Sequence, residues 1–196
     1  MNISIPLSII LLSTPLLGQQ VPFAATANNG FGLDLYREMA AREGNLCLSP
    51  FSIVTALGMT GNGAAGDTLT EMEKALHCPG KLSQLSASLS ILLEDFGKRK
   101  EQAAALAGKN PARKNGEPSF DLTVTNSLFG QKGYPFRKEF LTTLEKLYRA
   151  PLQFADFRND AAKERARINE WVSARTNEKI QELLPEGSLD SSTGLV

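Results

Sequence analysis

The sequence predicts an α+β fold in which helices fill most of the first half of the chain and strands enter later. Three observations carry this prediction. Apolar residues recur at helical spacing before residue 97, apolar and polar side chains alternate around residue 125, and a short apolar run follows Pro151. With 196 residues, 42% of them hydrophobic, the chain is long enough to bury one sizeable core. We therefore expect a single globular unit.

The first two helices are predicted by periodicity and by a start signal. Residues 29 to 43 are amphipathic, with apolar side chains at every fourth position: Phe31, Leu35 and Met39. Ser49-Pro50 supplies a hydroxyl that can cap free amides and a proline suited to the first helical position, so a second helix begins there and ends near Thr60. Apolar residues surround most of this second helix, and Gly58 within it indicates close approach by a neighbour. We expect the second helix to be buried on nearly all sides.

Two further helices and a loop complete the first half. Thr68-x-x-Glu71 has the form of a capping box and predicts a helix that ends near Leu76. A fourth helix is predicted from residue 82 to residue 96. Residues 98 to 118 are rich in Lys, Arg, Ala, Gly and Asn, which predicts a frayed helix end followed by a loop.

The second half predicts two strands and two helices. Residues 120 to 129 alternate between apolar and polar side chains, which is typical of a strand, and residues 130 to 135 predict a turn. Residues 140 to 148 predict a helix, and residues 151 to 157 a second strand. From residue 160 to residue 175 a strongly charged helix carries one narrow apolar stripe, formed by Ile168, Trp171 and Val172. A helix with such a stripe is expected to lie across a surface.

The N-terminal segment predicts a leader for export. Residues 3 to 17 are apolar and uncharged, but two prolines interrupt them and they are short for a membrane span, so a secretory signal peptide fits better than a membrane-tethered N-terminus. Small residues suited to cleavage occur at Gly18 and in the A-x-A arrangement Ala25-Thr26-Ala27. We expect residues 1–27 to be signal peptide and short leader and residues 28–196 to form the domain. The mature chain is then secreted or periplasmic and has no membrane span.

Charge and residue usage exclude several function classes. The 21 Lys and Arg residues balance 21 Asp and Glu residues, so no net field attracts nucleic acid or an anionic membrane. His77 is the single histidine, which leaves little from which to build a nucleophile and its base, and we expect no catalytic residues, no cofactor and no metal. Residues 61 to 66 satisfy G-x-G-x-x-G, but they follow a predicted helix rather than a strand and are interpreted as a turn. Cys47 and Cys78 are expected to be free, buried thiols, with a disulfide as the alternative after export.

Two long stretches of the chain resemble one protein family. The first comprises NLCLSPFSI (45–53), ALGM (56–59) and NGAAGDT (62–68). The second comprises TNSLF (125–129), YPF (134–136), INEWV (168–172), TNEKI (176–180), Leu184-Pro185 and Leu189-Asp190. Through these motifs, nearly all of residues 29 to 196 resembles the N-terminal part of the serpins, a family of serine protease inhibitors.

The resemblance implies an α+β serpin fold with helices A to F and the first strands of the main sheet A. It also implies a chain that stops before the C-terminal sheets and the reactive-centre loop. Serpins inhibit a target serine or cysteine protease as suicide substrates, because the cleaved loop inserts into sheet A as an extra strand. Ser49 and Ser52 match the shutter, where sheet opening is controlled, and Trp171 lies on the helix that covers the sheet. Without the loop, the chain as given is expected to be inactive alone.

The alternative function is that of a non-inhibitory serpin-fold protein, which binds a partner or serves as a scaffold. Such a protein could bind a polyanion through the basic region 98 to 114, with contacts at Lys98, Arg99, Lys100, Arg113 and Lys114. A solvated charged loop is the plainer interpretation of the same residues. The target protease and its P1 residue depend on the reactive-centre loop, which these residues do not contain.

Overall fold

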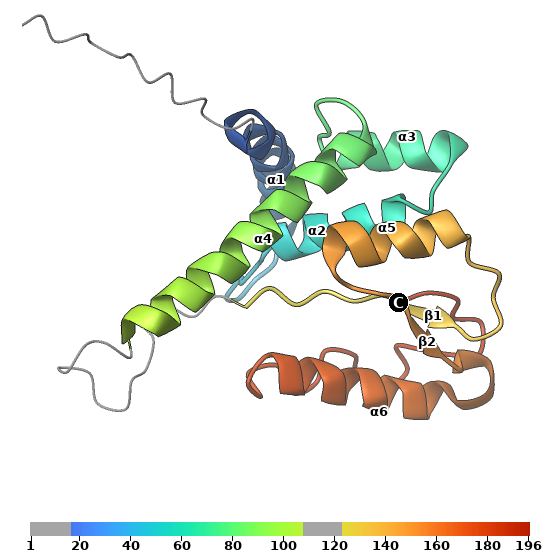
Figure 1. Ribbon diagram of the computed structural model, residues 1–196. Helices are drawn as coiled ribbons and strands as arrows, with labels where there is room; N and C mark the ends of the chain where they lie inside the picture. The colour runs from blue at the N-terminus through green and yellow to red at the C-terminus, as the bar shows by residue number, and fades with distance from the viewer. Residues whose placement is uncertain (1–16, 108–122) are drawn as a thin grey trace, which may run out of the picture.

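The computed structural model describes residues 17–107 and 123–196. In Figure 1, α4 runs diagonally across the molecule, and β1 and β2 lie between α5 and α6. The elements follow one another as α1 (Leu17–Ala40), α2 (Pro50–Gly61), α3 (Gly66–Ala75), α4 (Leu82–Ala107), β1 (Phe129–Gln131), α5 (Lys138–Tyr148), β2 (Gln153–Ala155) and α6 (Phe157–Arg175).

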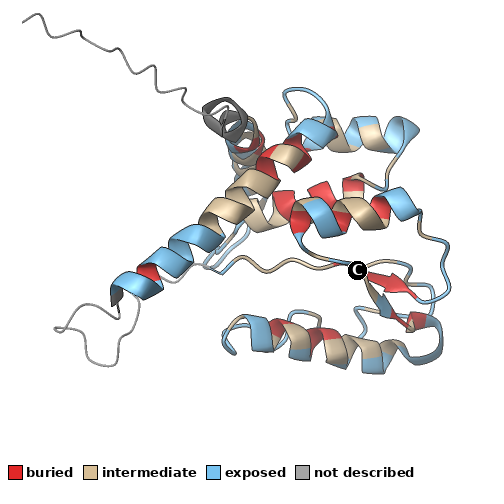
Figure 2. Cartoon of the chain, in the orientation of Figure 1, coloured by how far each residue is buried: buried red, intermediate tan, exposed pale blue. Residues whose placement is uncertain are grey.

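The larger core, which we call the helical core, lies where α1, α2, α4 and α5 meet. Figure 2 shows the buried residues gathered at this junction, whereas the far end of α4 is mostly exposed. Burying apolar side chains here is the main source of stability for the first half of the chain. The buried members of this core are Ala24, Ala27, Val54, Met59, Leu76, Leu82, Leu85, Leu89, Leu128, Phe140, Leu144 and Tyr148.

Helices α1 and α4 are both longer than the sequence predicts. Helix α1 begins at Leu17 rather than near residue 29, and it places Ala24 and Ala27 in the helical core with no exposed surface. Helix α4 continues past residue 96 to Ala107, so Lys98, Arg99 and Lys100 belong to a regular helix rather than to a frayed end.

Helix α2 begins where the sequence predicts, whereas α3 begins earlier than its predicted capping box. Ser49 caps α2 by accepting a hydrogen bond from the Ser52 amide, and Pro50 is the first helical residue. The fully buried residues of α2 lie on one side and its other residues are half-buried, so the expected burial on nearly all sides is confirmed only in part. The prediction that a capping box at residues 68 to 71 starts α3 is wrong. Gly66, at φ 58°, turns the chain into α3 two residues earlier, and Ala65 is the N-cap.

The sheet is small, and β1 is its central strand. Strand β1 pairs in parallel with β2, and Gly130 lies opposite Phe154. On its other edge β1 pairs with the end of the chain: the Phe129 amide donates to the Val196 carbonyl at 2.8 Å, and the Val196 amide donates back at 2.9 Å. The bridge between Gly130 and Leu195 is antiparallel.

The first strand is shorter than predicted. Residues 123 to 128 form no strand, and β1 occupies positions from which the sequence predicted a turn. The last hydrogen bond between the two strands at this end runs from the Gln153 amide to the Leu128 carbonyl. Two residues earlier lies Pro151, which has no N–H to donate, so the pairing ends there. The predicted positions 120 to 122 lie outside the described residues.

A second, smaller core, which we call the sheet core, joins α6 to the strands. Its buried residues are Phe129, Ala155, Phe157, Ile168 and Val172. Figure 1 shows α6 lying across this sheet, as expected from its narrow apolar stripe. The helix carries a kink at Asp160, where φ is −151° and ψ is 62°.

The two cysteines differ in their surroundings. Both thiols are free, as one of the two interpretations of the sequence expected. Cys47 is exposed, so its expected burial is wrong, whereas Cys78 is half-buried against the helical core. The segment that carries Cys47 lies between α1 and α2 and is exposed along residues 41 to 47.

Candidate functional site

The candidate site is the space between the helical core and α6, together with the polar groups around it. The hydroxyls of Ser49 and Ser52, which open α2, pair with each other. Ser49 Oγ lies 3.0 Å from Ser52 Oγ and accepts a hydrogen bond from the Ser52 amide at 3.4 Å. Ser49 is exposed and Ser52 is half-buried. The hydrogen bonds of these two hydroxyls are therefore local: they cap the helix and join the two serines to each other.

A buried polar network lies further along α2. Asn62 Nδ2 donates to the Gly58 carbonyl at 2.6 Å, to Ser86 Oγ at 2.9 Å and to Tyr148 Oη at 3.2 Å. Tyr148 Oη in turn donates to Ser86 Oγ at 2.8 Å. Burial raises the pKa of the Tyr148 phenol, while its bonds to Ser86 and Asn62 act in the opposite direction. The network ties α2, α4 and α5 together through satisfied groups.

Helix α6 is attached to the sheet through aromatic rings and arginines. The Trp171 ring meets the Phe129 ring edge to face, with centroids 5.6 Å apart. Arg167 lies over the Phe129 ring at 5.4 Å and donates to the Phe154 carbonyl at 3.0 Å. Arg175 lies over the Trp171 ring at 5.6 Å. These contacts add to a narrow apolar stripe, so α6 rests on the sheet through a limited surface.

A cavity of about 480 Å³ lies between α2 and α6. Thr55 and Met59 of α2 line one side and Trp171 and Arg175 of α6 the other, and residues 124 to 127 run along the wall. Asn126 Nδ2 is buried here and has no hydrogen-bond partner within the described ranges 17–107 and 123–196. An unpartnered buried amide is costly, on the order of 1–3 kcal/mol, so this wall has an unused donor.

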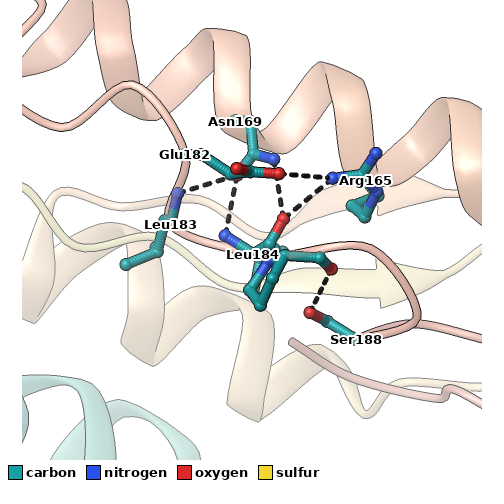
Figure 3. A network of polar contacts seen from close by, with 7 residues as sticks. Arg165, Asn169, Glu182, Leu183, Leu184 and Ser188 are labelled. Atoms are coloured by element: carbon teal, nitrogen blue, oxygen red, sulfur yellow. Dashed lines mark hydrogen bonds and ion pairs between the residues drawn. The ribbon is translucent and has the colours of Figure 1, made fainter.

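A clamp of hydrogen bonds holds the segment after α6 against that helix (Figure 3). Asn169 Oδ1 accepts from the amides of Leu183 and Leu184 at 3.1 and 2.9 Å, and Asn169 Nδ2 donates to the Leu184 carbonyl at 2.9 Å. Arg165 donates to the same carbonyl at 3.0 Å and pairs with Glu182 at 3.1 Å. Asn169 is buried, so these bonds fix the segment 182 to 184 to α6, and Leu184 also packs against the sheet core.

The structure keeps the predicted site residues apart. Ser49 and Ser52 do not line the cavity, although Thr55, one turn further along α2, does. Trp171 lines the cavity from the opposite side. Of the predicted shutter and sheet-covering residues, Trp171 therefore faces this space, whereas Ser49 and Ser52 lie outside its lining.

The basic residues form a separate region at the far end of α4. Lys98 pairs with Glu94 at 2.7 Å, Arg99 pairs with Asp95 at 2.6 Å, and Lys100 donates to Thr123 Oγ1 at 2.6 Å. The pairs are exposed, so they are weak and a polyanion could displace them. Arg113 and Lys114 lie outside the described residues.

Sequence reasoning missed three asparagines: Asn62, Asn126 and Asn169. Each lies within a quoted motif, yet its role depends on partners distant in the chain: Asn62 bonds to Ser86 and Tyr148, and Asn169 to residues 183 and 184. The available signal was an amide residue next to buried apolar neighbours, because a buried amide needs partners.

Neither metal binding nor membrane crossing has support in the part of the chain that the structure describes. There, no three His, Cys, Asp or Glu side chains gather closely enough to hold a metal ion. Among the same residues, no helix combines the length and the apolarity that crossing a bilayer requires.

Comparison with known proteins assigns the family. The model of the serpin family, described as serine protease inhibitor, matches residues 26–196. Human serpin B13 is 37% identical over 168 residues, which are 84% of this chain and 42% of that protein. The leukocyte elastase inhibitor of Bos taurus is 37% identical over 174 residues, which are 88% of this chain and 41% of that protein.

Solved structures agree on the fold. Emu ovalbumin (Dromaius novaehollandiae) is similar with a TM-score of 0.67 and 25% identity, over 88% of this chain and 44% of that chain. An Arabidopsis serpin in its native stressed conformation is similar with a TM-score of 0.64 and 26% identity, over 91% of this chain and 42% of that chain. This chain thus spans less than half the length of the relatives it matches, and the expected α+β fold of a serpin's N-terminal part is confirmed. The chain belongs to the serpin family.

Proposed function

We propose that this chain is the N-terminal half of an inhibitory serpin and does not inhibit a protease on its own. One observation carries the proposal: residues 194 to 196 pair with β1, and the residues shortly before β1, 124 to 127, line the cavity between α2 and α6. The family is one of serine protease inhibitors, and one relative is named as an elastase inhibitor. The proposed target is a serine or cysteine protease, and the chain has no catalytic role of its own.

The antiparallel register of Leu195 beside β1 supports the idea that the cavity can accommodate a further strand. Leu195 lies antiparallel to Gly130, so a strand continuing in this register would pass Leu128, Asn126 and Val124 in turn. Residues 124 to 127 form the wall of the cavity. In the intact inhibitor, a strand placed there would fill the space and could offer Asn126 Nδ2 an acceptor.

The attachment of α6 supports a helix that can release the sheet. Its contacts are a short apolar stripe, one ring pair and two arginines that lie over aromatic rings, and such a surface is weaker than the helical core. We assign Trp171 to this detachable contact. Ser49 and Ser52 are assigned to the shutter, where their mutual bond could be exchanged for bonds to a strand that lies over α2.

The test uses an intact serpin that carries residues 1–196 as its N-terminal half, as the proposal requires. The intact protein is mixed with a panel of serine and cysteine proteases. The formation of a complex is then followed by gel electrophoresis under denaturing conditions. We expect a denaturant-resistant complex of protease and cleaved inhibitor, because the acyl bond survives unfolding. The 196-residue chain is the control and should form none. An intact protein that is cleaved by every protease without forming a complex would instead be a non-inhibitory serpin.

The second candidate, polyanion binding, is favoured by the extension of α4. The extension carries Lys98, Arg99 and Lys100 on a regular helix, and the first two side chains are more than 60% exposed. A heparin column separates the two cases: binding through these residues should be lost when Lys98 and Arg99 are both changed to Ala. If the parent and the double variant are retained equally on the column, Lys98 and Arg99 have no role in binding.

Export through the N-terminal leader is part of the proposal. The support is the uncharged apolar run before residue 17 and the small residues that follow it. Expression of the full chain in a secreting host, with the product sought in the medium or periplasm, tests this part.

A further inference from the structure

The segment between the two candidate cleavage positions belongs to the folded domain. Ala24 and Ala27 have no exposed surface and are members of the helical core. Phe23 is half-buried and packs against the same core. The three side chains recur at helical spacing on one face of α1, which is how a helix presents a packed surface. The A-x-A triplet that resembles a cleavage site is therefore part of a packed helix.

A long-range hydrogen bond ties the same segment to α4. The Ala24 amide donates to Ser88 Oγ at 3.0 Å across 64 positions of sequence. Ser88 is buried at 1% exposure, so this contact lies inside the core rather than at its rim. Removal of residue 24 would leave the interior of α4 without this partner and would open space beside it.

Cleavage after Ala27 would also place a charge where the structure has none. The new ammonium group would form at Asn28, which is half-buried and lies next to the buried Ala27. A partly buried charge is costly unless it is paired. Cleavage at Gly18 leaves Phe23, Ala24 and Ala27 in place, so it keeps the core contacts of this segment.

We propose that the mature protein retains residues 23 to 27 and that the leader is removed upstream of them, at the Gly18 candidate. The inference rests on the export proposed above and deepens it. Because signal cleavage precedes folding, the structure does not block the A-x-A triplet sterically. A product that starts at Asn28 would instead lack part of its core, namely Ala24 and Ala27.

The first experiment determines the N-terminus of the exported protein. The full chain is expressed with its own leader, and the product is sequenced from its N-terminus and weighed by mass spectrometry. We expect a first residue between 19 and 23. An exported protein that begins at Asn28 would overturn the inference and leave export intact. An unprocessed chain retained in the cell would overturn export and, with it, the cut at Gly18.

The second experiment tests the packing of the segment without relying on export. Ala27→Asp places a carboxylate in the core, and Ala25→Asp places the same group at an exposed position of the same helix. We expect Ala27→Asp to accelerate amide exchange of residues 23 to 30 by about 10-fold or more, and Ala25→Asp by less than about 2-fold. Equal exchange in the two variants would show that the segment does not pack and would overturn the inference.

Discussion

The helical core and the sheet core of this chain are built to different degrees of completion. The helical core has fully buried side chains from α1, α2, α4 and α5, and the network of Asn62, Ser86 and Tyr148 satisfies its buried polar groups. The sheet core has five buried residues and leaves Phe154 54% exposed. The difference teaches that the helices bury enough apolar surface to support one another, whereas the sheet and α6 have fewer buried contacts to stabilise them.

The cavity lies at the boundary between the two cores. Its walls come from α2 on one side and α6 on the other, and Asn126 Nδ2 beside it has no partner among the residues that the structure describes. The proposed function requires the main sheet to open, and a boundary with an unfilled space and an unused donor is a place where packing can change. The following predictions test whether the two cores behave as separate units.

The largest expected effect comes from truncating the centre of the helical core. Leu144 has no exposed surface, and Leu144→Ala should destabilise this core by about 2–5 kcal/mol. Ile168 is 2% exposed in the sheet core, and Ile168→Ala should cost about 2 kcal/mol, at the low end of the same range. Hydrogen exchange read peptide by peptide is the measurement, because a single melting curve would average the two cores.

The pattern of exchange decides whether the cores are separate. Leu144→Ala should accelerate exchange in α2, α4 and α5 together, and Ile168→Ala should accelerate it in α6 alone. If each variant accelerates exchange in every helix, the chain unfolds as one cooperative unit and the comparison fails.

Two glycines within helices test how tightly the helical core is packed, and Gly58 is the first of them. A Cβ atom at Gly58 would lie 3.0 Å from Tyr148 Oη and 3.4 Å from a Leu89 methyl carbon. Tyr148 Oη cannot easily yield, because Asn62 and Ser86 hold it, so Gly58→Ala should destabilise by about 1–3 kcal/mol.

Gly97→Ala is the matched control for Gly58. Gly97 also lies within a helix, but a Cβ atom there would meet nothing within 4 Å. The helix propensity of alanine should then stabilise α4 by about 0.5–1 kcal/mol. Urea titration of both variants gives the sign, and a Gly58→Ala protein as stable as the parent would mean that the approach of Tyr148 is not tight.

Local signals in the sequence predicted some elements well. Ser49-Pro50 marked the start of α2, the apolar spacing predicted α5, and Gly58 correctly indicated a close neighbour. The first two depend on a few adjacent residues or on one helix face, and the third on a residue type that is unfavourable inside a helix unless a neighbour comes close. Such features survive in any surroundings, which is why they could be predicted.

Features that depend on distant partners could not be predicted. The alanines at the start of α1 carry little hydrophobic signal and are buried only because α4 packs on them. Cys47 has apolar neighbours in sequence, but no element covers it among the described residues, and it is exposed. Of the candidate site, Trp171 was found from its stripe, whereas the clamp at Asn169 needs the fold of residues 182 to 184.

The clamp at Asn169 predicts a local effect in the sheet half. Asn169→Ala removes the acceptor of the Leu183 and Leu184 amides and should cost about 1 kcal/mol, which corresponds to roughly 5-fold faster exchange of those amides. Glu170→Ala changes the neighbouring exposed residue and should leave their exchange unaltered. Exchange that spreads from Asn169→Ala into α2 or α4 would contradict the separation of the two cores.

The smallest expected effect is a titration at the edge of the helical core. Burial, and next the charge of Glu73, raise the pKa of the Cys78 thiol from 9.0 to about 11. The folded protein therefore keeps the proton that the unfolded chain loses, so this contribution to stability is present below about pH 9 and is lost as the pH rises toward about 11. In a Cys47→Ser variant, alkylation of Cys78 should reach half its maximal rate near pH 11 in the folded chain and near pH 9 in denaturant. Glu73→Gln keeps the hydrogen bond to the Leu82 amide and should lower the folded midpoint only slightly, because burial is the larger cause. A folded midpoint near pH 9 would mean that the wall of the helical core at Cys78 is open to water, and the contrast between the two cores would then be weaker than the buried side chains indicate.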